Sequence, residues 1–157
     1  MTVAGWMGHA LLAAGLMVGT GTATAQANEG CVLHQQTYTC NQVEFATEWN
    51  SAGTVTVEAS PRDKIAAAQL REMVARMGKT AGPAGDLTIM VVQRDTTGLY
   101  VGPAGIELGS IRVYAPGTEG KRGNLVWAEI YTGQPDMSWP AVVHALVMQF
   151  EGKFGKK

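Results

Sequence analysis

The chain reads GTVTVEASPRDKIAAAQLREMVARMG over residues 53–78, and this stretch decides the fold because its hydrophobic period changes from two to 3.6. Val55 and Val57 alternate with polar side chains, which predicts a strand. The next residues, Ser60-Pro-Arg-Asp63, supply an N-cap hydroxyl, a proline at the first helical position and an early acid. We therefore expect a strand followed by an amphipathic helix that ends at about Met77.

Three further extended segments and a second helix follow this β-α unit. Residues 87–92, LTIMVV, are uniformly apolar, which predicts a central strand buried on both faces. The segments 106–114 and 124–131 flank a glycine-rich polar loop and so predict a hairpin. Trp139-Pro140 opens a final helix with one strongly apolar side. The order β-α-β-β-β-α indicates an α+β fold, with an antiparallel or mixed sheet packed against two helices.

The tetrapeptide Gly-Pro-Ala-Gly occurs twice, at 82–85 and at 102–105, each time before an apolar segment. A duplicated unit or a binding loop would produce such a repeat. Proline and glycine are also the residues that ordinary turns require, and we interpret both copies as turns.

The first 27 residues have the pattern of a signal peptide. They contain no Lys, Arg, Asp or Glu and end in Ala25-Gln-Ala27, and their apolar run over 10–18 is shorter than the roughly 20 residues that span a bilayer. We expect cleavage near Ala27, with the mature protein in the periplasm or outside the cell and without a stable membrane anchor. The mature chain would then comprise an N-terminal extension, residues 28–52, and a single domain, residues 53–157.

Cys31 and Cys40 lie in this extension, and disulfides persist outside the cytoplasm. We predict that they form one disulfide, which closes the extension and leaves its extended stretch as a candidate edge strand. A metal site built from both thiols and His34 is the alternative, but no fourth ligand lies nearby and oxidation would remove the thiolates. No metal site and no cofactor are therefore expected.

The charge balance is nearly neutral, with 12 basic against 13 acidic residues. It gives no reason to expect nucleic acid or an anionic membrane as a partner. The motifs of serine hydrolases, zinc proteases, phosphate-binding loops and calcium loops are missing from the sequence. His144 and the scattered carboxylates are the remaining candidates for proton transfer, and nothing in their spacing pairs them.

The aromatic residues near the last expected strand leave two interpretations open. Trp127 and Tyr131 alternate on one strand face with Glu129 between them, and Trp139 follows across a turn. If the final helix covers this face, the rings belong to the core. If the helices lie on the other face, Trp127, Glu129 and Tyr131 form an exposed strip of the kind that binds a partner or a sugar chain. We take these three residues as the candidate binding residues.

Three segments carry a fold-level resemblance: GNLVWAEIYTG over 123–133, WPAVVH over 139–144 and LVMQF over 146–150. With this element order, the chain resembles uncharacterised exported bacterial proteins that contain a domain of unknown function. The Asp86-Leu-Thr-Ile strand and the Leu-Val-Trp strand are also similar to envelope lipoprotein domains of the penicillin-binding-protein activator and curli-secretion types. The resemblance implies a place in the bacterial envelope, although this chain lacks the lipid-processing cysteine of those proteins.

We therefore expect a small exported, non-enzymatic protein of the bacterial envelope. Its partner would be an envelope protein or polysaccharide, bound through a sheet face or edge. The competing hypothesis is a hydrolase that acts on a cell-wall or extracellular polymer, with His144 or one of the acids as the proton-transfer group.

Overall fold

The computed structural model describes residues 30–34, 37–60, 63–93, 101–102, 105–106, 108–134 and 136–156. The expected signal peptide, residues 1–27, lies outside these ranges. In chain order the described elements are β1 (Val32–His34), β2 (Thr37–Thr39), α1 (Gln42–Ser51), β3 (Thr54–Glu58), α2 (Lys64–Arg76), β4 (Thr80–Ala81), β5 (Leu87–Gln93), β6 (Val101–Gly102), β7 (Gly105–Ile106), β8 (Gly109–Pro116), β9 (Arg122–Ile130) and α3 (Trp139–Phe154).

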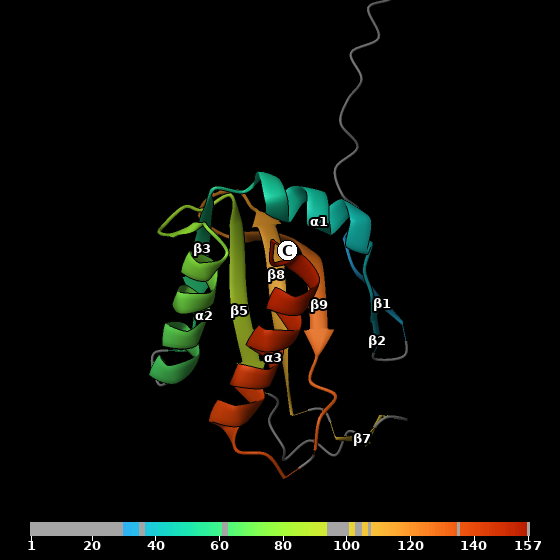
Figure 1. The fold of residues 1–157 in the computed structure, drawn as a ribbon. Helices are drawn as coiled ribbons and strands as arrows, with labels where there is room; N and C mark the ends of the chain where they lie inside the picture. The colour runs from blue at the N-terminus through green and yellow to red at the C-terminus, as the bar shows by residue number, and fades with distance from the viewer. Residues whose placement is uncertain are drawn as a thin grey trace, which may run out of the picture.

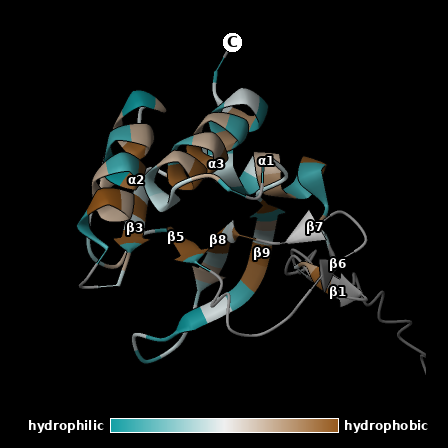
Figure 2. Cartoon of the chain, turned by 90° about the horizontal axis from the view of Figure 1, so that it is seen from below, coloured by the Kyte–Doolittle hydropathy of each residue, from teal (hydrophilic) through white to brown (hydrophobic). Residues whose placement is uncertain are grey.

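Five strands form the central sheet, in the order β4-β3-β5-β8-β9. β3 runs parallel to β4 and β5, whereas β5, β8 and β9 are antiparallel neighbours. All three helices lie on one side of this sheet (Figure 1, Figure 2). The predicted α+β class with a mixed sheet is confirmed, with one helix more than expected. β1 and β2 pair with each other in a separate sheet, so the described part of the extension does not add the expected edge strand.

Asp63 caps the N-terminus of α2. Its Oδ1 accepts the backbone N–H of Ala66 at 3.0 Å, and its Oδ2 accepts the indole N–H of Trp139 at 2.7 Å. The prediction of Ser60 as the N-cap is wrong, because the carboxylate three residues later binds both the helix start and the indole. This contact holds the start of α3 beside the start of α2. The predicted end of the helix is confirmed, with Met77 as the C-cap.

Asp86 ties the start of β5 to the start of β3. Its Oδ2 accepts the backbone N–H groups of Gly53 at 2.8 Å and Thr54 at 3.0 Å. These two bonds stabilise the carboxylate and hold the pKa of Asp86 below its ordinary value, with the bond from Thr54 as the largest cause. The carboxylate therefore fixes the register of two neighbouring parallel strands.

The first Gly-Pro-Ala-Gly segment, 82–85, is a turn that packs directly on β3. The Thr56 hydroxyl donates to the Gly82 carbonyl at 3.0 Å and accepts the Gly85 N–H at 2.8 Å. A Cβ at Gly85 would lie 2.5 Å from the backbone nitrogen of Thr56, so only glycine fits there. Turn chemistry thus accounts for this copy, while the second copy, 102–105, lies partly outside the described residues.

β5 is the middle strand of the sheet, as its apolar sequence predicts. Its residues alternate in burial. Leu87, Ile89 and Val91 are buried, whereas those between them are partly exposed. The prediction of burial on both faces is wrong, because every described helix packs against the same side of the sheet.

β8 and β9 form the predicted antiparallel hairpin. Val113 pairs with Trp127 and Tyr114 pairs with Leu125, so Val126 is an extra residue on β9. Val126 and Trp127 are consecutive, yet they are 1% and 6% exposed and both belong to the hydrophobic core. The bulge at this point therefore interrupts the simple alternation that the sequence suggests.

An aromatic cluster from α1, β9 and α3 fills the space between the helices and the sheet. Phe45 stacks on Trp127 with ring centroids 5.2 Å apart, and it meets Phe154 edge-on at 4.8 Å. Trp49 and Phe150 complete the cluster, 4.9 Å from each other. Residues of the expected extension thus belong to the same core as the β-α unit.

α1 is capped at both ends, although it was not predicted. The Asn41 side chain accepts the backbone N–H groups of Val43 and Glu44 at the N-terminus. At the C-terminus, the Lys79 ammonium donates to the carbonyl oxygens of Trp49 and Ala52. This lysine directly precedes β4, the edge strand opposite β9. The C-terminal end of α1 is therefore attached to that edge of the sheet.

Candidate functional site

Trp127 and Tyr131, two of the three predicted binding residues, lie beneath the helices. Each is 6% exposed. Trp127 packs between Phe45 of α1 and Phe154 of α3, with ring centroids 5.2 Å and 4.9 Å away. The prediction of an exposed aromatic strip is wrong, because α1 and α3 cover this face of β9. Trp127 and Tyr131 belong to the hydrophobic core, as the first interpretation predicted.

Glu129, the third predicted residue, is held by α3. Its Oε1 accepts a hydrogen bond from the Lys153 ammonium at 2.6 Å, and its side chain is 9% exposed. The same ammonium lies 5.7 Å from the centroid of the Trp127 ring. Removing the Lys153 charge would leave the Glu129 carboxylate, which is mostly buried, without its cation, so the pair anchors α3 to β9. Glu129 therefore has a structural role in this arrangement.

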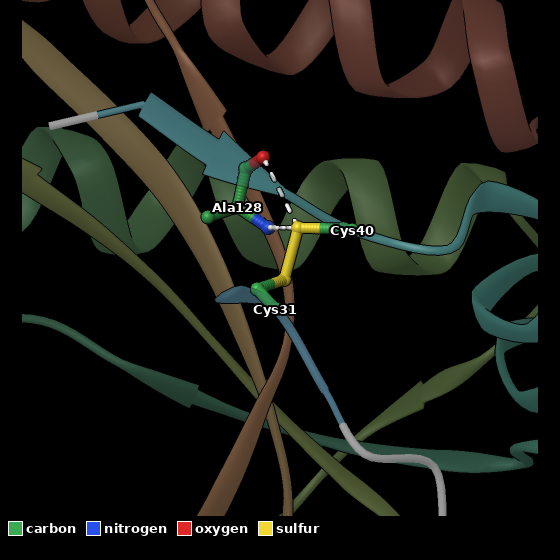
Figure 3. Close-up of a disulfide and its surroundings, with 3 residues drawn as sticks. All are labelled: Cys31, Cys40 and Ala128. Atoms are coloured by element: carbon green, nitrogen blue, oxygen red, sulfur yellow. Dashed lines mark hydrogen bonds between the residues drawn. A yellow bond between two sulfur atoms is a disulfide. The ribbon is translucent and has the colours of Figure 1, made fainter. Parts of the chain in front are cut away.

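The predicted disulfide between Cys31 and Cys40 is present and covers part of the outer edge of β9 (Figure 3). The backbone N–H of Cys31 donates to the Leu125 carbonyl at 2.7 Å, and the N–H of Ala128 donates to Cys40 Sγ at 3.3 Å. β9 is the last strand of the sheet, and such edges bind further strands when they are free. The disulfide segment occupies two of the edge groups, and no free thiol is left to bind a metal.

The opposite side of the central sheet has no described helix against it (Figure 2). Along β3, β5 and β8, the residues that alternate with core side chains point to this side. We call this surface the open face. It comprises Thr56, Glu58, Thr88, Met90, Arg112 and Tyr114, together with Arg122 of β9, and each is partly or fully exposed.

Arg122 crosses the open face from β9 to β3. Its guanidinium carbon lies 4.9 Å from the centroid of the Tyr114 ring, and its Nε lies 3.5 Å from Glu58 Oε2. Its Nη1 also contacts the sulfur of Met90 on β5. An exposed ion pair contributes little to stability, but these three contacts hold the guanidinium flat over the sheet.

Arg112 is the second cation of the open face. Its Nε donates to the Ser110 hydroxyl at 3.1 Å, and its guanidinium carbon lies 5.5 Å from the centroid of the Tyr38 ring. Tyr38 belongs to β2, so the disulfide-closed hairpin also contributes to this surface. Met90 is the cross-strand neighbour of Arg112 and a contact of Arg122. Met90 therefore lies in the strand between Glu58 and Arg112 and contacts Arg122 directly.

The candidate catalytic residues are not brought together in the described part of the chain. Glu58 and Asp63 line one groove beside α2, but Glu58 is ion-paired and Asp63 caps the helix. His144 is exposed on α3, and Glu151 is ion-paired with α2 at 2.9 Å. Within the described ranges, no group of three or more His, Cys, Asp or Glu side chains could hold a metal. Among these described side chains, Glu58, Asp63 and Glu151 are each bonded to other groups, and His144 lies apart from them on α3.

The sequence indicates part of the open face through an alternation that the sequence prediction did not use. In Ser110-Ile-Arg-Val-Tyr114, polar and aromatic residues alternate with two β-branched core residues. This alternation identifies Arg112 and Tyr114 as facing away from the core. The position of Arg122 beside them has no such signal, because it depends on the hairpin register.

Comparisons with protein-family models, with curated proteins and with solved structures find no match for this chain. The comparisons therefore assign no family. A fold alone does not determine function, so we infer a function from the chemistry of the open face.

Proposed function

We propose that this chain is a small non-enzymatic protein that acts outside the cytoplasm and binds another component of the bacterial envelope through the open face. The Cys31–Cys40 disulfide and the uncharged N-terminal 27 residues support an exported protein. The helices of the described part of the chain are all too short or too polar to span a membrane.

The observation that carries the proposal is the difference in chemistry between the two faces of the sheet. One face is closed by three helices over an aromatic core. The open face carries two guanidinium groups, two tyrosine rings and a methionine, which are residue types enriched where proteins bind partners. A hydrolase would need carboxylates free to move a proton, and Glu58 and Asp63 are both occupied by other bonds.

Co-sedimentation with isolated bacterial cell envelopes tests this proposal. We expect the wild-type protein to sediment with the envelopes and Tyr114→Ala to lose most of that binding, because it removes from the open face the ring that lies against Arg122. Met148→Ala is the matched control, since it removes a 52% exposed side chain from α3 on the opposite side of the molecule. Equal binding by wild type, Tyr114→Ala and Met148→Ala would contradict the proposal.

A further inference from the structure

We propose that the ligand of the open face is an acidic polysaccharide, whose carboxylates bind Arg112 and Arg122 and whose sugar rings lie on the tyrosines. This inference rests on the proposed function, because it identifies the ligand class of the same surface. Three features of the open face support it: its charge, the contacts that hold its cations and the strand edges beside it.

The described residues of the open face carry more positive than negative charge. They include the guanidinium groups of Arg112 and Arg122 and one carboxylate, that of Glu58. Glu58 pairs with Arg122, and among the described residues Arg112 forms no ion pair. The whole chain has a formal net charge of −1, so the positive charge is local to this surface and points to a negatively charged ligand.

Arg112 is oriented by two neighbours. Its Nε–H donates to the Ser110 hydroxyl, and its guanidinium carbon lies 5.5 Å from the centroid of the Tyr38 ring. Among the described residues, the Nε–H is the one N–H group of this side chain with a hydrogen-bond partner, and we propose that the terminal N–H groups bind the ligand. A guanidinium held in this way binds a planar carboxylate through two parallel hydrogen bonds at a low entropic cost.

An extended polysaccharide suits this surface better than an extended peptide does. Extended peptides commonly bind by adding a strand to a sheet edge, and here the disulfide segment occupies part of the β9 edge while β4 is only two residues long. The open face presents the rings of Tyr38 and Tyr114, whose centroids lie 5.5 Å and 4.9 Å from the guanidinium carbons of Arg112 and Arg122. Tyrosine combines an apolar body with a polar tip, which suits the mixed surface of a sugar ring. An extended acidic polysaccharide can lie along the strands and place successive carboxylates near both arginines.

Calorimetric titration with polygalacturonate and with its methyl ester tests the inference. The ester has the same sugar chain without the carboxylate charge. We expect wild type to bind polygalacturonate at least about tenfold more tightly than the ester, and Arg112→Gln to lose most of this preference, since tenfold is 1.4 kcal/mol, close to the lower end of what one charge-assisted hydrogen bond contributes. Arg76→Gln is the matched control, because it removes the same charge from the helix layer and should keep the preference.

Equal binding of the two polymers, no binding of either, or an unchanged preference in Arg112→Gln would each overturn the inference. The envelope experiment separates this failure from failure of the proposed function. If Tyr114→Ala still reduces sedimentation with envelopes, only the ligand class is wrong. If the envelope experiment also shows no effect of Tyr114→Ala, the open face is not the binding surface.

Discussion

The two faces of the central sheet are built from alternate residues of the same strands but have opposite chemistry. On β8, Ile111 and Val113 are fully buried beneath the helices, whereas Arg112 and Tyr114 are partly exposed on the open face. The helix-covered face is stabilised by ring packing and by the ion pair between Lys153 and the mostly buried Glu129. The open face has cation-π contacts and a solvated ion pair, which contribute little to the stability of the fold. We propose that its side chains bind a ligand instead.

This difference shows that the largest aromatic residues need not lie on an exposed surface. Trp127 and Tyr131 are the most prominent aromatic residues of β9 and its end, and both are in the core. The smaller set of Tyr38 and Tyr114 is placed beside cations on the opposite side. Mutations on the two faces should therefore separate stability from binding.

The largest expected effect is the loss of Trp127. Trp127→Ala removes a ring that contacts Phe45 and Phe154, and we expect it to lower the free energy of unfolding by about 3 to 5 kcal/mol. Tyr114→Ala on the opposite face should cost about 1 kcal/mol or less, because it removes a partly exposed ring and one cation-π contact. Urea denaturation measures both values. Similar costs for the two variants would contradict the assignment of the faces.

The second largest expected effect is the loss of the disulfide that closes the β1–β2 hairpin beside the edge of β9. Replacing both Cys31 and Cys40 by serine should lower the free energy of unfolding by roughly 2 to 3 kcal/mol, because the short loop is no longer restricted in the unfolded chain. The Ala128 amide should also exchange with solvent faster, since it loses its bond to Cys40 Sγ. Unchanged exchange at Ala128 would show that the hairpin holds the edge without the disulfide.

The smallest expected effect is the loss of the Asp86 carboxylate, which links the parallel strands β3 and β5. The pKa of Asp86 is lowered in the folded state, so its contribution to stability is present above the pKa of an unfolded aspartate and is lost as pH falls through the folded value. Asp86→Asn should therefore be less stable than wild type at pH 7, and the difference should shrink below about pH 4. Urea midpoints at pH 7 and pH 3 measure it. A constant difference would show that charge at Asp86 does not stabilise β3.

The periodic parts of the fold were predictable from the sequence. The alternation over residues 53–58, the helical period that follows and the apolar strand over 87–92 all depend on local order, and the β5 position and the β8–β9 hairpin are confirmed. α1 was not predicted because its ten residues contain only two large buried side chains, Phe45 and Trp49. Its Asn41 N-cap was the available signal.

The proposed binding surface was harder to predict because it depends on contacts between distant residues. Sequence alternation predicts that Trp127 and Glu129 share a face, but which face the helices cover is decided by tertiary packing. The bulge at Val126 and the reach of Arg122 to Glu58, from β9 to β3, follow from strand register. Neither has a local signature in the sequence.

Hydroxyl-radical footprinting of the wild-type protein, free and bound to bacterial cell envelopes, tests the open face most directly. In the free protein, Met90, Tyr114 and Met148 should be oxidised, and Met73, which is fully buried, should not. On binding, we predict that oxidation of Met90 and Tyr114 falls while that of Met148 on α3 is unchanged. Protection of Met148 with unchanged oxidation of Met90 and Tyr114 would contradict the account and place the binding surface on the helices.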